Sequence, residues 1–168
     1  MGFERDTVLD ALGWQLLLAL QEDARRSFAD LARLVNLSPP AVAERVRRME
    51  EAGIITGYGA QVDPGQIGLP LVVFIHLSTT PDKYPSVVRV ASESPEIVEC
   101  HHVAGATSFI IKLSVASLPH LEQIIKSLSV YGSTSSHIVL STPVKKRVLS
   151  WRSKDEGGGR RRPRSRSR

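Results

Sequence analysis

The sequence predicts an α+β protein with two domains, three helices first and then strands that alternate with helices. Apolar residues recur at helical spacing through roughly the first fifty residues, glycines and prolines then crowd residues 57–70, and β-rich apolar runs follow. A chain of 168 residues has room for two small domains, which excludes a large multi-domain enzyme. No stretch approaches the roughly 20 uncharged residues that a membrane helix needs.

The basic charge of the chain is concentrated at its C-terminal end. The formal net charge is +5, but residues 160–168 hold six of the 22 basic residues and no acid, which leaves 16 basic and 17 acidic residues, a net charge of −1. Nucleic-acid binding therefore has to come from a local group of basic residues. The single cysteine, Cys100, cannot form an internal disulfide, and one cysteine is too few for a structural zinc site. This cysteine content agrees with a reducing compartment.

Two helices are predicted at the start of the first domain. Leucines at spacings of three and four predict a first helix near residues 6–21. Gly13 lies inside this helix and should weaken it by about 1 kcal/mol relative to alanine. The second helix is predicted over residues 27–35, with Ser27 as its N-cap and Asp30 completing a partial capping box.

A short turn is predicted to join the second helix to a third. Asn36 tolerates the left-handed conformation that ends a helix, and Leu37 can fill the core. Ser38 then caps the third helix, with Pro39 at its first position. Two short helices joined by a turn of about three residues, the second rich in arginine, are typical of a winged-type helix-turn-helix domain that binds DNA.

The exposed side of the third helix is predicted to contact DNA. Val42, Val46 and Met49 define its buried side. A recognition helix presents its N-terminal half to the bases, which here carries Ser38, Pro40, Ala43, Glu44 and Arg47. Arg45 and Arg48 are better placed for phosphates. A second interpretation makes Glu44 and Arg48, four residues apart, an ordinary surface ion pair, and both interpretations can hold.

The pattern changes after the hinge at residues 57–70, which holds four glycines and two prolines. Strands are predicted at 71–77, 97–103, 109–115 and 136–140, with helices through 84–91 and 118–128. The order βαββαβ predicts a ferredoxin-like domain, an antiparallel sheet with both helices on one face. A second subunit is the natural cover for the other face.

Several segments together resemble one family of regulators. The chain is similar to the leucine-responsive/asparagine-operon (Lrp/AsnC, feast/famine) family over roughly residues 5–147, through residues 9–17, 31–39, 41–55, 98–105 and 138–141. The resemblance implies a transcription regulator with a helix-turn-helix and a ferredoxin-like effector domain that dimerises and often builds octamers. It also implies a small amino acid as the effector.

The turn that starts at Gly105 is the predicted effector site. Its backbone amides and the hydroxyls of Thr107 and Ser108 are suited to a carboxylate. The family often has Gly-Asp-x-Asp at this turn and adds two hydroxyls near the last strand, so the predicted site comprises Gly105, Ala106, Thr107, Ser108, Thr134 and Ser136. The alternative is a tight hairpin in which glycine supplies a positive φ and the polar residues only form the turn.

Cys100, His101 and His102 raise the alternative of an enzyme like the siroheme decarboxylases, which use a related architecture. Adjacent residues of a strand point to opposite faces, so His101 and His102 cannot serve one centre. The remaining histidines are scattered along the sequence, at His76, His120 and His137. A third alternative, an effector sensor without DNA binding, is disfavoured by the arginine-rich third helix.

The sequence therefore predicts a DNA-binding transcriptional regulator and not an enzyme. Its expected partners are double-stranded DNA, a small amino-acid-like effector and further copies of the chain, as a homodimer or an octamer. No metal, cofactor or membrane is expected, and the expected location is the cytoplasm, in association with the nucleoid. The predicted domains are the helix-turn-helix at 1–56, the hinge at 57–70, the effector and oligomerisation domain at 71–150 and a disordered basic tail at 151–168. The tail is expected either to act as a phosphate-binding arm or to have no role.

Overall fold

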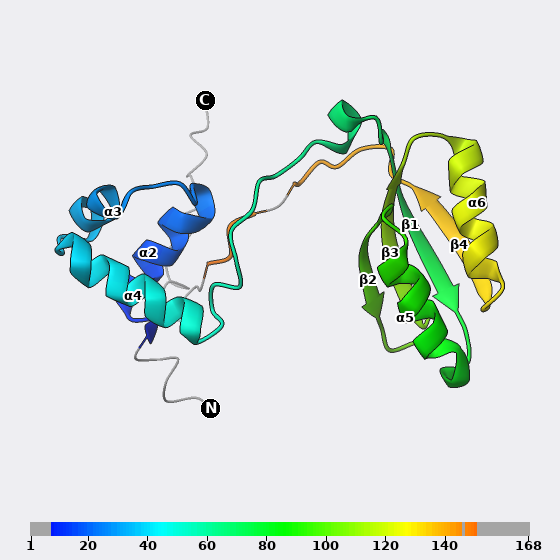
Figure 1. Ribbon diagram of the computed structural model, residues 1–168, viewed down its shortest axis with the longest axis horizontal. Coiled ribbons are helices and arrows are strands. Elements are labelled where there is room, and N and C mark those ends of the chain that lie inside the picture. Colours follow the sequence, from blue (N-terminus) through cyan, green and yellow to red (C-terminus); the bar gives the residue numbers. More distant parts are fainter. Residues whose placement is uncertain (1–7, 146, 151–168) are drawn as a thin grey trace, which may run out of the picture. The chain divides into compact units, whose positions relative to one another are not determined.

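The computed structural model describes residues 8–145 and 147–150, which divide into two units (Figure 1). The helical unit comprises residues 8–59 and 147–150, and the sheet unit comprises Ala60–Lys145. The predicted tail at 151–168 and the first residues of the predicted first helix lie outside the described residues.

The helical unit is built from three helices around one apolar core. These are α2 (Ala11–Glu22), α3 (Phe28–Val35) and α4 (Pro39–Glu51). The buried residues that form the core come from all three helices: Leu16, Ala19, Leu20, Leu31, Ala32, Val35, Val42, Val46 and Met49. Val42, Val46 and Met49 are buried, which confirms the predicted buried side of the third helix.

The start of α2 differs from the prediction of a helix from residue 6. The helix begins at Ala11 because Asp10 caps it, accepting a hydrogen bond from the Gly13 backbone N–H at 2.7 Å. The prediction that Gly13 weakens the helix relative to alanine does not hold at this position, because an alanine has no room here. A Cβ at this position would lie 2.4 Å from the Val8 carbonyl oxygen, so glycine allows the chain to approach here.

The turn between α3 and α4 is as predicted. Ser27 accepts from the Asp30 backbone N–H at 3.1 Å at the start of α3, and Asn36 ends the helix in the left-handed conformation, with φ 54°. Leu37 packs against the core, and Ser38 caps α4 by accepting from the Ala41 backbone N–H. Local side-chain chemistry thus determines where α4 begins.

Residues 147–150 return to the helical unit, which the sequence did not indicate. The Gln21 side-chain amide on α2 donates to the Leu149 carbonyl and accepts from the Leu149 backbone N–H, both at 2.9 Å. One amide side chain thus satisfies both backbone groups of a residue 128 positions away along the chain.

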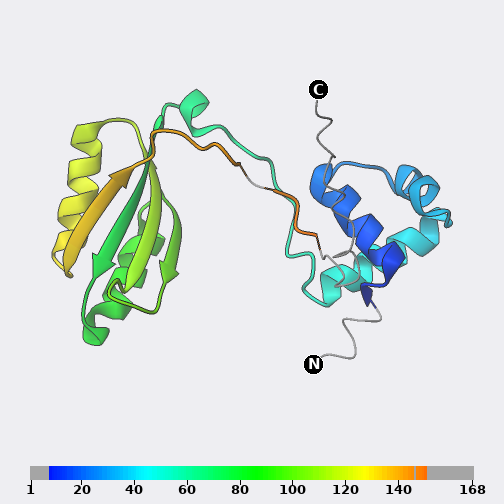
Figure 2. The ribbon, with the colours of Figure 1, turned by 180° about the vertical axis from the view of Figure 1, so that it is seen from behind.

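The sheet unit confirms the ferredoxin-like order of elements. Its elements are β1 (Leu71–Ser78), α5 (Tyr84–Glu93), β2 (Ile97–His102), β3 (Phe109–Val115), α6 (Leu118–Ser129) and β4 (Ser133–Ile138), with the short turns η1 (Pro64–Ile67) and η2 (Pro81–Lys83). The strands form one antiparallel sheet in the order β2-β3-β1-β4. Strands β2 and β4 are therefore its edges (Figure 2).

The last strand begins earlier than predicted. The sequence predicts a strand at 136–140, whereas β4 runs from Ser133, paired with Ser78, to Ile138, paired with Val73. Serine and threonine dominate its first half, so apolar patterning did not reveal it. Its backbone pairing with β1 is what makes it a strand.

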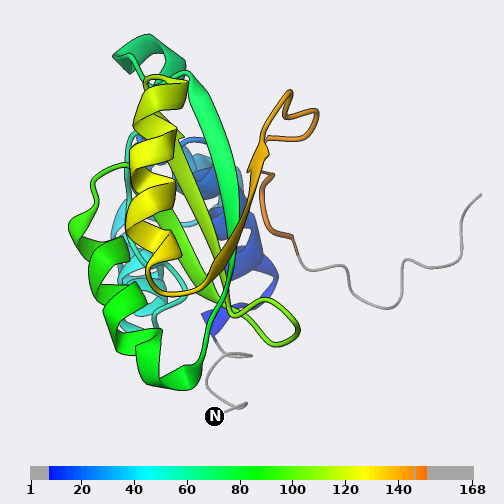
Figure 3. The same ribbon diagram turned by 90° about the vertical axis from the view of Figure 1, so that its right-hand side faces the viewer.

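The two faces of the sheet differ sharply. Helices α5 and α6 lie on the same side of the sheet (Figure 3), and the buried core lies between them and the strands. The strand residues in this core are Val73, Ile75, Leu77, Phe109, Ile111, Leu113 and Val115. The opposite face, here called the uncovered face, carries no helix of the sheet unit. Successive residues of a strand point to opposite faces, so the residues between the core positions lie on the uncovered face. They include Val72, Phe74, His76, Glu99, His101, Ile110, Lys112, Ser135 and His137.

A glycine at the start of β4 allows a close backbone contact. A Cβ at Gly132 would lie 2.2 Å from the Ser78 carbonyl oxygen. We expect Gly132→Ala to lower the free energy of unfolding of the sheet unit by about 1–3 kcal/mol, because paired backbone on β1 cannot move aside easily. Scanning calorimetry of the full chain measures this.

Gly59→Ala is the matched control, because a Cβ at Gly59 would have no atom within 4 Å. Its unfolding free energy should stay within about 0.5 kcal/mol of the wild type. An unchanged transition in the Gly132 variant would contradict the close contact.

Candidate nucleic-acid interface and effector site

All seven predicted DNA-contacting residues lie on α4 or at its N-cap. Ser38 and Pro40 are exposed at the N-terminal end, and Ala43 and Glu44 are half-buried. Arg47 and Arg48 are exposed, with side chains 54% and 61% accessible, so both can reach a bound polymer.

Glu44 holds two arginines of α4 at once. Arg47 donates to Glu44 through two nitrogens, at 2.7 and 2.9 Å, and Arg48 donates to the same carboxylate at 2.9 Å. A second carboxylate, Glu51, also pairs with Arg47. These hydrogen bonds, those of Arg47 first, lower the pKa of Glu44 to about 2, so the carboxylate stays charged at neutral pH.

The predicted surface ion pair between Glu44 and Arg48 is therefore formed in the free protein. This ion pair is compatible with DNA binding. Exposed ion pairs contribute only about 0–1 kcal/mol, so a phosphate or a base edge can replace the carboxylate without a large loss. The two-nitrogen donation that Arg47 makes to Glu44 is also the geometry with which arginine binds guanine or phosphate.

Arg45 has a different environment from the other arginines. Its Nη1 donates to the Asp10 carboxylate at 2.9 Å, and its side chain is 30% accessible. Asp10 accepts this bond beside the backbone N–H of Gly13, and the Gly13 bond is the larger cause of its lowered pKa. Arg45 thus ties α4 to the start of α2. Asp10, three residues before Gly13, has the spacing of an N-cap, a signal that the sequence interpretation missed.

The predicted effector turn is part of a longer loop, residues 103–108, here called the effector loop. Gly105 has φ 134°, a conformation that side chains rarely adopt. Ser108 is buried, and its hydroxyl donates to the Thr79 carbonyl at 3.0 Å and accepts from the Thr79 N–H at 3.1 Å. The expectation that this hydroxyl receives a carboxylate is not supported by its position, because both of its functions are already used.

The effector loop meets β4 at the end of β1. The Ser108 backbone N–H donates to the Leu77 carbonyl at 3.0 Å, and Leu77 is paired with Thr134 on the other side. Ser78 also donates to the Ala106 carbonyl at 2.9 Å. Residues 105–108 and Thr134 are therefore brought to one corner of the sheet, whereas Ser136 lies two residues further along β4, opposite Ile75.

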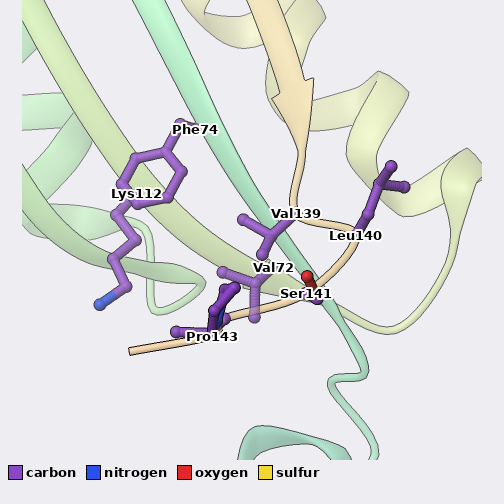
Figure 4. Close-up of a pocket in the computed structure, with 8 residues that line it drawn as sticks. Val72, Phe74, Lys112, Val139, Leu140, Ser141 and Pro143 are labelled. Atoms are coloured by element: carbon purple, nitrogen blue, oxygen red, sulfur yellow. The ribbon is translucent and has the colours of Figure 1, made fainter. Parts of the chain in front are cut away.

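Two grooves lie away from this loop. One of about 530 Å³ on the uncovered face is mostly apolar and is formed by Val72, Phe74, Lys112 and residues 139–143 (Figure 4). The other, of about 320 Å³, lies between α5 and β2 beside Cys100 and His102. The effector loop lines neither groove.

Cys100, His101 and His102 do not form one centre, as expected for neighbours on a strand. His102 packs on the helix side against Tyr84 and Phe109, with ring centroids 4.7 and 5.0 Å away. His101 contacts Glu99 at 3.1 Å on the uncovered face. Burial raises the pKa of the Cys100 thiol, which disfavours the reactive thiolate.

The interpretation of the other histidines as scattered is wrong for two of them. His76 on β1 and His137 on β4 lie side by side on the uncovered face, with ring centroids 4.8 Å apart. They are 61 residues apart in sequence, so only the strand register brings them together. His120 is separate, with its ring 2.9 Å from a Glu96 oxygen.

Comparison with known proteins agrees with both units. The AsnC-type helix-turn-helix domain matches residues 9–50, and the Lrp/AsnC ligand binding domain matches residues 72–149. The chain belongs to the Lrp/AsnC family. It is a DNA-binding transcriptional regulator with a ligand-binding domain. None of the helices in the described part of the chain is long and apolar enough to span a bilayer.

The relatives include regulators of known structure. The regulator LrpC of Bacillus subtilis is 33% identical over 133 residues, covering 79% of this chain and 92% of LrpC, and its structure superposes with a TM-score of 0.78. Regulatory protein AsnC of Escherichia coli is 32% identical over 146 residues, covering 84% of this chain and 96% of AsnC. A transcriptional regulator of Neisseria meningitidis, solved as an L-methionine complex, is 26% identical with a TM-score of 0.78 and covers 84% of this chain and 96% of its own.

Removing the carboxylate that two arginines share should leave Arg48 without its partner and Arg47 with Glu51 alone. We expect Glu44→Gln to bind random duplex DNA more tightly, because fewer ion pairs on α4 then have to be exchanged for phosphates. The slope of log affinity against log salt should steepen by roughly 0.9 for each additional phosphate that the released arginines neutralise. Fluorescence anisotropy at several salt concentrations measures both quantities.

Glu122→Gln is the matched control, because it makes the same charge change on exposed α6 in the other unit. It should leave the slope unchanged. Equal slopes for the Glu44 variant and the wild type would show that the ion pairs on α4 do not limit DNA binding.

Proposed function

We propose that α4 enters the major groove and reads bases with the exposed residues of its N-terminal half. The supporting observation is that Arg47 is exposed, charged and held in a two-nitrogen geometry by a carboxylate. The residues assigned to the bases are Ser38, Pro40, Ala43, Glu44 and Arg47. Arg48 contacts phosphate, and Arg45 adds a phosphate contact from the edge of the helix while it holds Asp10.

A second copy of the chain covers the uncovered face, so the regulator is a homodimer, from which octamers assemble. The apolar groove formed by Val72, Phe74 and residues 139–143 supports this assignment, because an unpaired apolar surface of this kind favours association. A two-fold interface makes one surface patch meet its own copy and brings two α4 helices to one DNA site.

The effector is a small amino-acid-like molecule that binds at the effector loop. The L-methionine complex of the Neisseria relative supports the ligand class, and the backbone freedom at Gly105 supports the place. The donors on this chain are the loop amides and the hydroxyls of Thr107, Thr134 and Ser136, while Ala106 lines the loop and Ser108 fixes the loop to Thr79. The effector changes DNA binding if it prefers one assembly over another.

The protein works in the cytoplasm in association with the nucleoid, and it acts by binding and not by catalysis. Relatives named as transcriptional regulators support both statements. In this proposal the DNA-binding domain ends near residue 56, residues 57–70 are the hinge, and the effector domain follows from residue 71.

Arg47→Ala tests the assignment of α4. With DNA selected from a random pool, the variant should bind about 1–3 kcal/mol more weakly, since a two-nitrogen contact to a base is lost. Its folding stability should change little because the side chain is exposed. Fluorescence anisotropy with the selected DNA and with a scrambled duplex measures the difference.

The control is Arg89→Ala, which removes an exposed arginine from α5. It should bind the selected DNA like the wild type. Unchanged affinity of the Arg47 variant would remove that residue from the interface.

Gly105→Val tests the effector loop. Valine is strained at positive φ, and its side chain obstructs access to the loop backbone. We expect the variant to lose the rise in melting temperature that an amino acid produces in the wild type, while DNA binding persists. A thermal-shift screen with the common amino acids measures the response.

Gly68→Val is the matched control, because Gly68 also has positive φ, 84°, with nothing within 4 Å of a Cβ. It carries the same kind of strain outside the loop and should retain the response. A retained response in the Gly105 variant would place the effector elsewhere.

A further inference from the structure

Two imidazole rings lie next to each other on the uncovered face, outside the DNA interface and the effector loop. His76 on β1 and His137 on β4 belong to neighbouring antiparallel strands. His76 is paired with Ser135, and His137 is paired with Phe74, so the two histidines are diagonal neighbours on one face. Their ring centroids are 4.8 Å apart, and their planes are inclined by 53°.

This spacing is that of two histidines bound to one metal ion. Zinc binds histidine nitrogen at about 2.0–2.1 Å in tetrahedral geometry, which places two ligand ring centres roughly 5 Å apart. The rings therefore need only rotate about their side-chain bonds, and the strands need not move. The sheet holds both backbones in a fixed register, so little conformational freedom is lost on binding.

A neighbouring hydroxyl can orient one of the rings. The Ser135 hydroxyl lies 3.3 Å from Nε2 of His137. When Nε2–H donates to this oxygen, the lone pair of the neutral ring is left on Nδ1. Histidines that bind metals usually have their other nitrogen held in this way, which fixes the tautomer.

Apolar side chains flank the pair, and a lysine on the same face is already paired with a carboxylate. Phe74 and Ile110 lie beside the two histidines in the strand register and provide an apolar flank. Lys112, on the same face, donates to Glu99 at 2.7 Å, so its charge is already paired. Among the described residues no group of three or more histidine, cysteine, aspartate or glutamate side chains is placed to hold a metal ion, so one chain supplies two ligands.

We propose that His76 and His137 form a chelating pair for a divalent transition-metal ion of the zinc class on the uncovered face. Imidazole is a preferred ligand of zinc, nickel and copper, whereas magnesium and calcium prefer oxygen. The inference deepens the proposed function, because this is the face assigned to the second subunit. Water or the second subunit's groups fill the remaining coordination positions.

Calorimetric titration of the untagged, metal-free full chain with zinc chloride tests the pair. The wild type should bind zinc, and His76→Gln and His137→Gln should each weaken binding by at least about tenfold, as expected for loss of one of two ligands. His101→Gln is the matched control, because His101 lies on the same face but contacts Glu99, and it should bind like the wild type. Circular dichroism melts in EDTA verify that all three variants fold.

Absence of zinc binding by the wild type, or wild-type affinity in either the His76 or the His137 variant, would overturn the proposal. Sedimentation velocity in buffer with EDTA measures the oligomeric state separately, because EDTA removes free metal from the solution. A monomer there would contradict the proposed dimer and leave the zinc result standing, whereas a dimer that does not bind zinc would leave the proposed function intact.

Discussion

An antiparallel sheet that carries helices on only one of its faces leaves the other face to water or to a partner. In the sheet unit, every second residue of β1 and β3 packs beneath α5 and α6, and the residues between them form the uncovered face. Phe74, Ile110 and the adjoining groove give this face an apolar area among its polar side chains, and a partner can cover that area. In the proposed homodimer a second copy covers this area, and the two-fold pairing supplies two recognition helices to one DNA site.

The second constraint is the balance of charge on α4. Without the last nine residues the chain carries a net charge of −1, and Arg47 and Arg48 are both paired with Glu44 in the free protein. Outside the last nine residues, overall charge therefore gives this chain no general attraction for DNA. In the proposed interface, affinity depends on the exchange of arginine partners at α4, which favours sites whose bases accept the guanidinium groups better than the carboxylate does.

Local chemistry made part of the structure predictable. The turn at Asn36 and the cap at Ser38 depend on residues within a few positions of each other, so the start of α4 followed from the sequence. The buried side of α4 followed from periodicity. The βαββαβ order also followed, because it needs only the sequence of elements and not their contacts.

The features that were missed depend on contacts distant in sequence. β4 is a strand because β1 pairs with it, although its own first residues are polar. The Ser108 hydroxyl donates a hydrogen bond to Thr79, 29 residues away in sequence. Arg45 donates a hydrogen bond to Asp10, 35 residues away in sequence. His76 and His137 lie together because of the strand register alone, which a single sequence specifies weakly for a strand as polar as β4.

Methylation protection measures whether α4 reads bases in the major groove. Dimethyl sulfate modifies guanine N7 in the major groove and adenine N3 in the minor groove. On DNA selected from a random pool, the full chain should protect guanine N7 in two half-sites, about 10–10.5 base pairs apart or a multiple of that distance. Bound DNA with every guanine N7 still reactive, or with protection confined to adenine N3, would contradict the account.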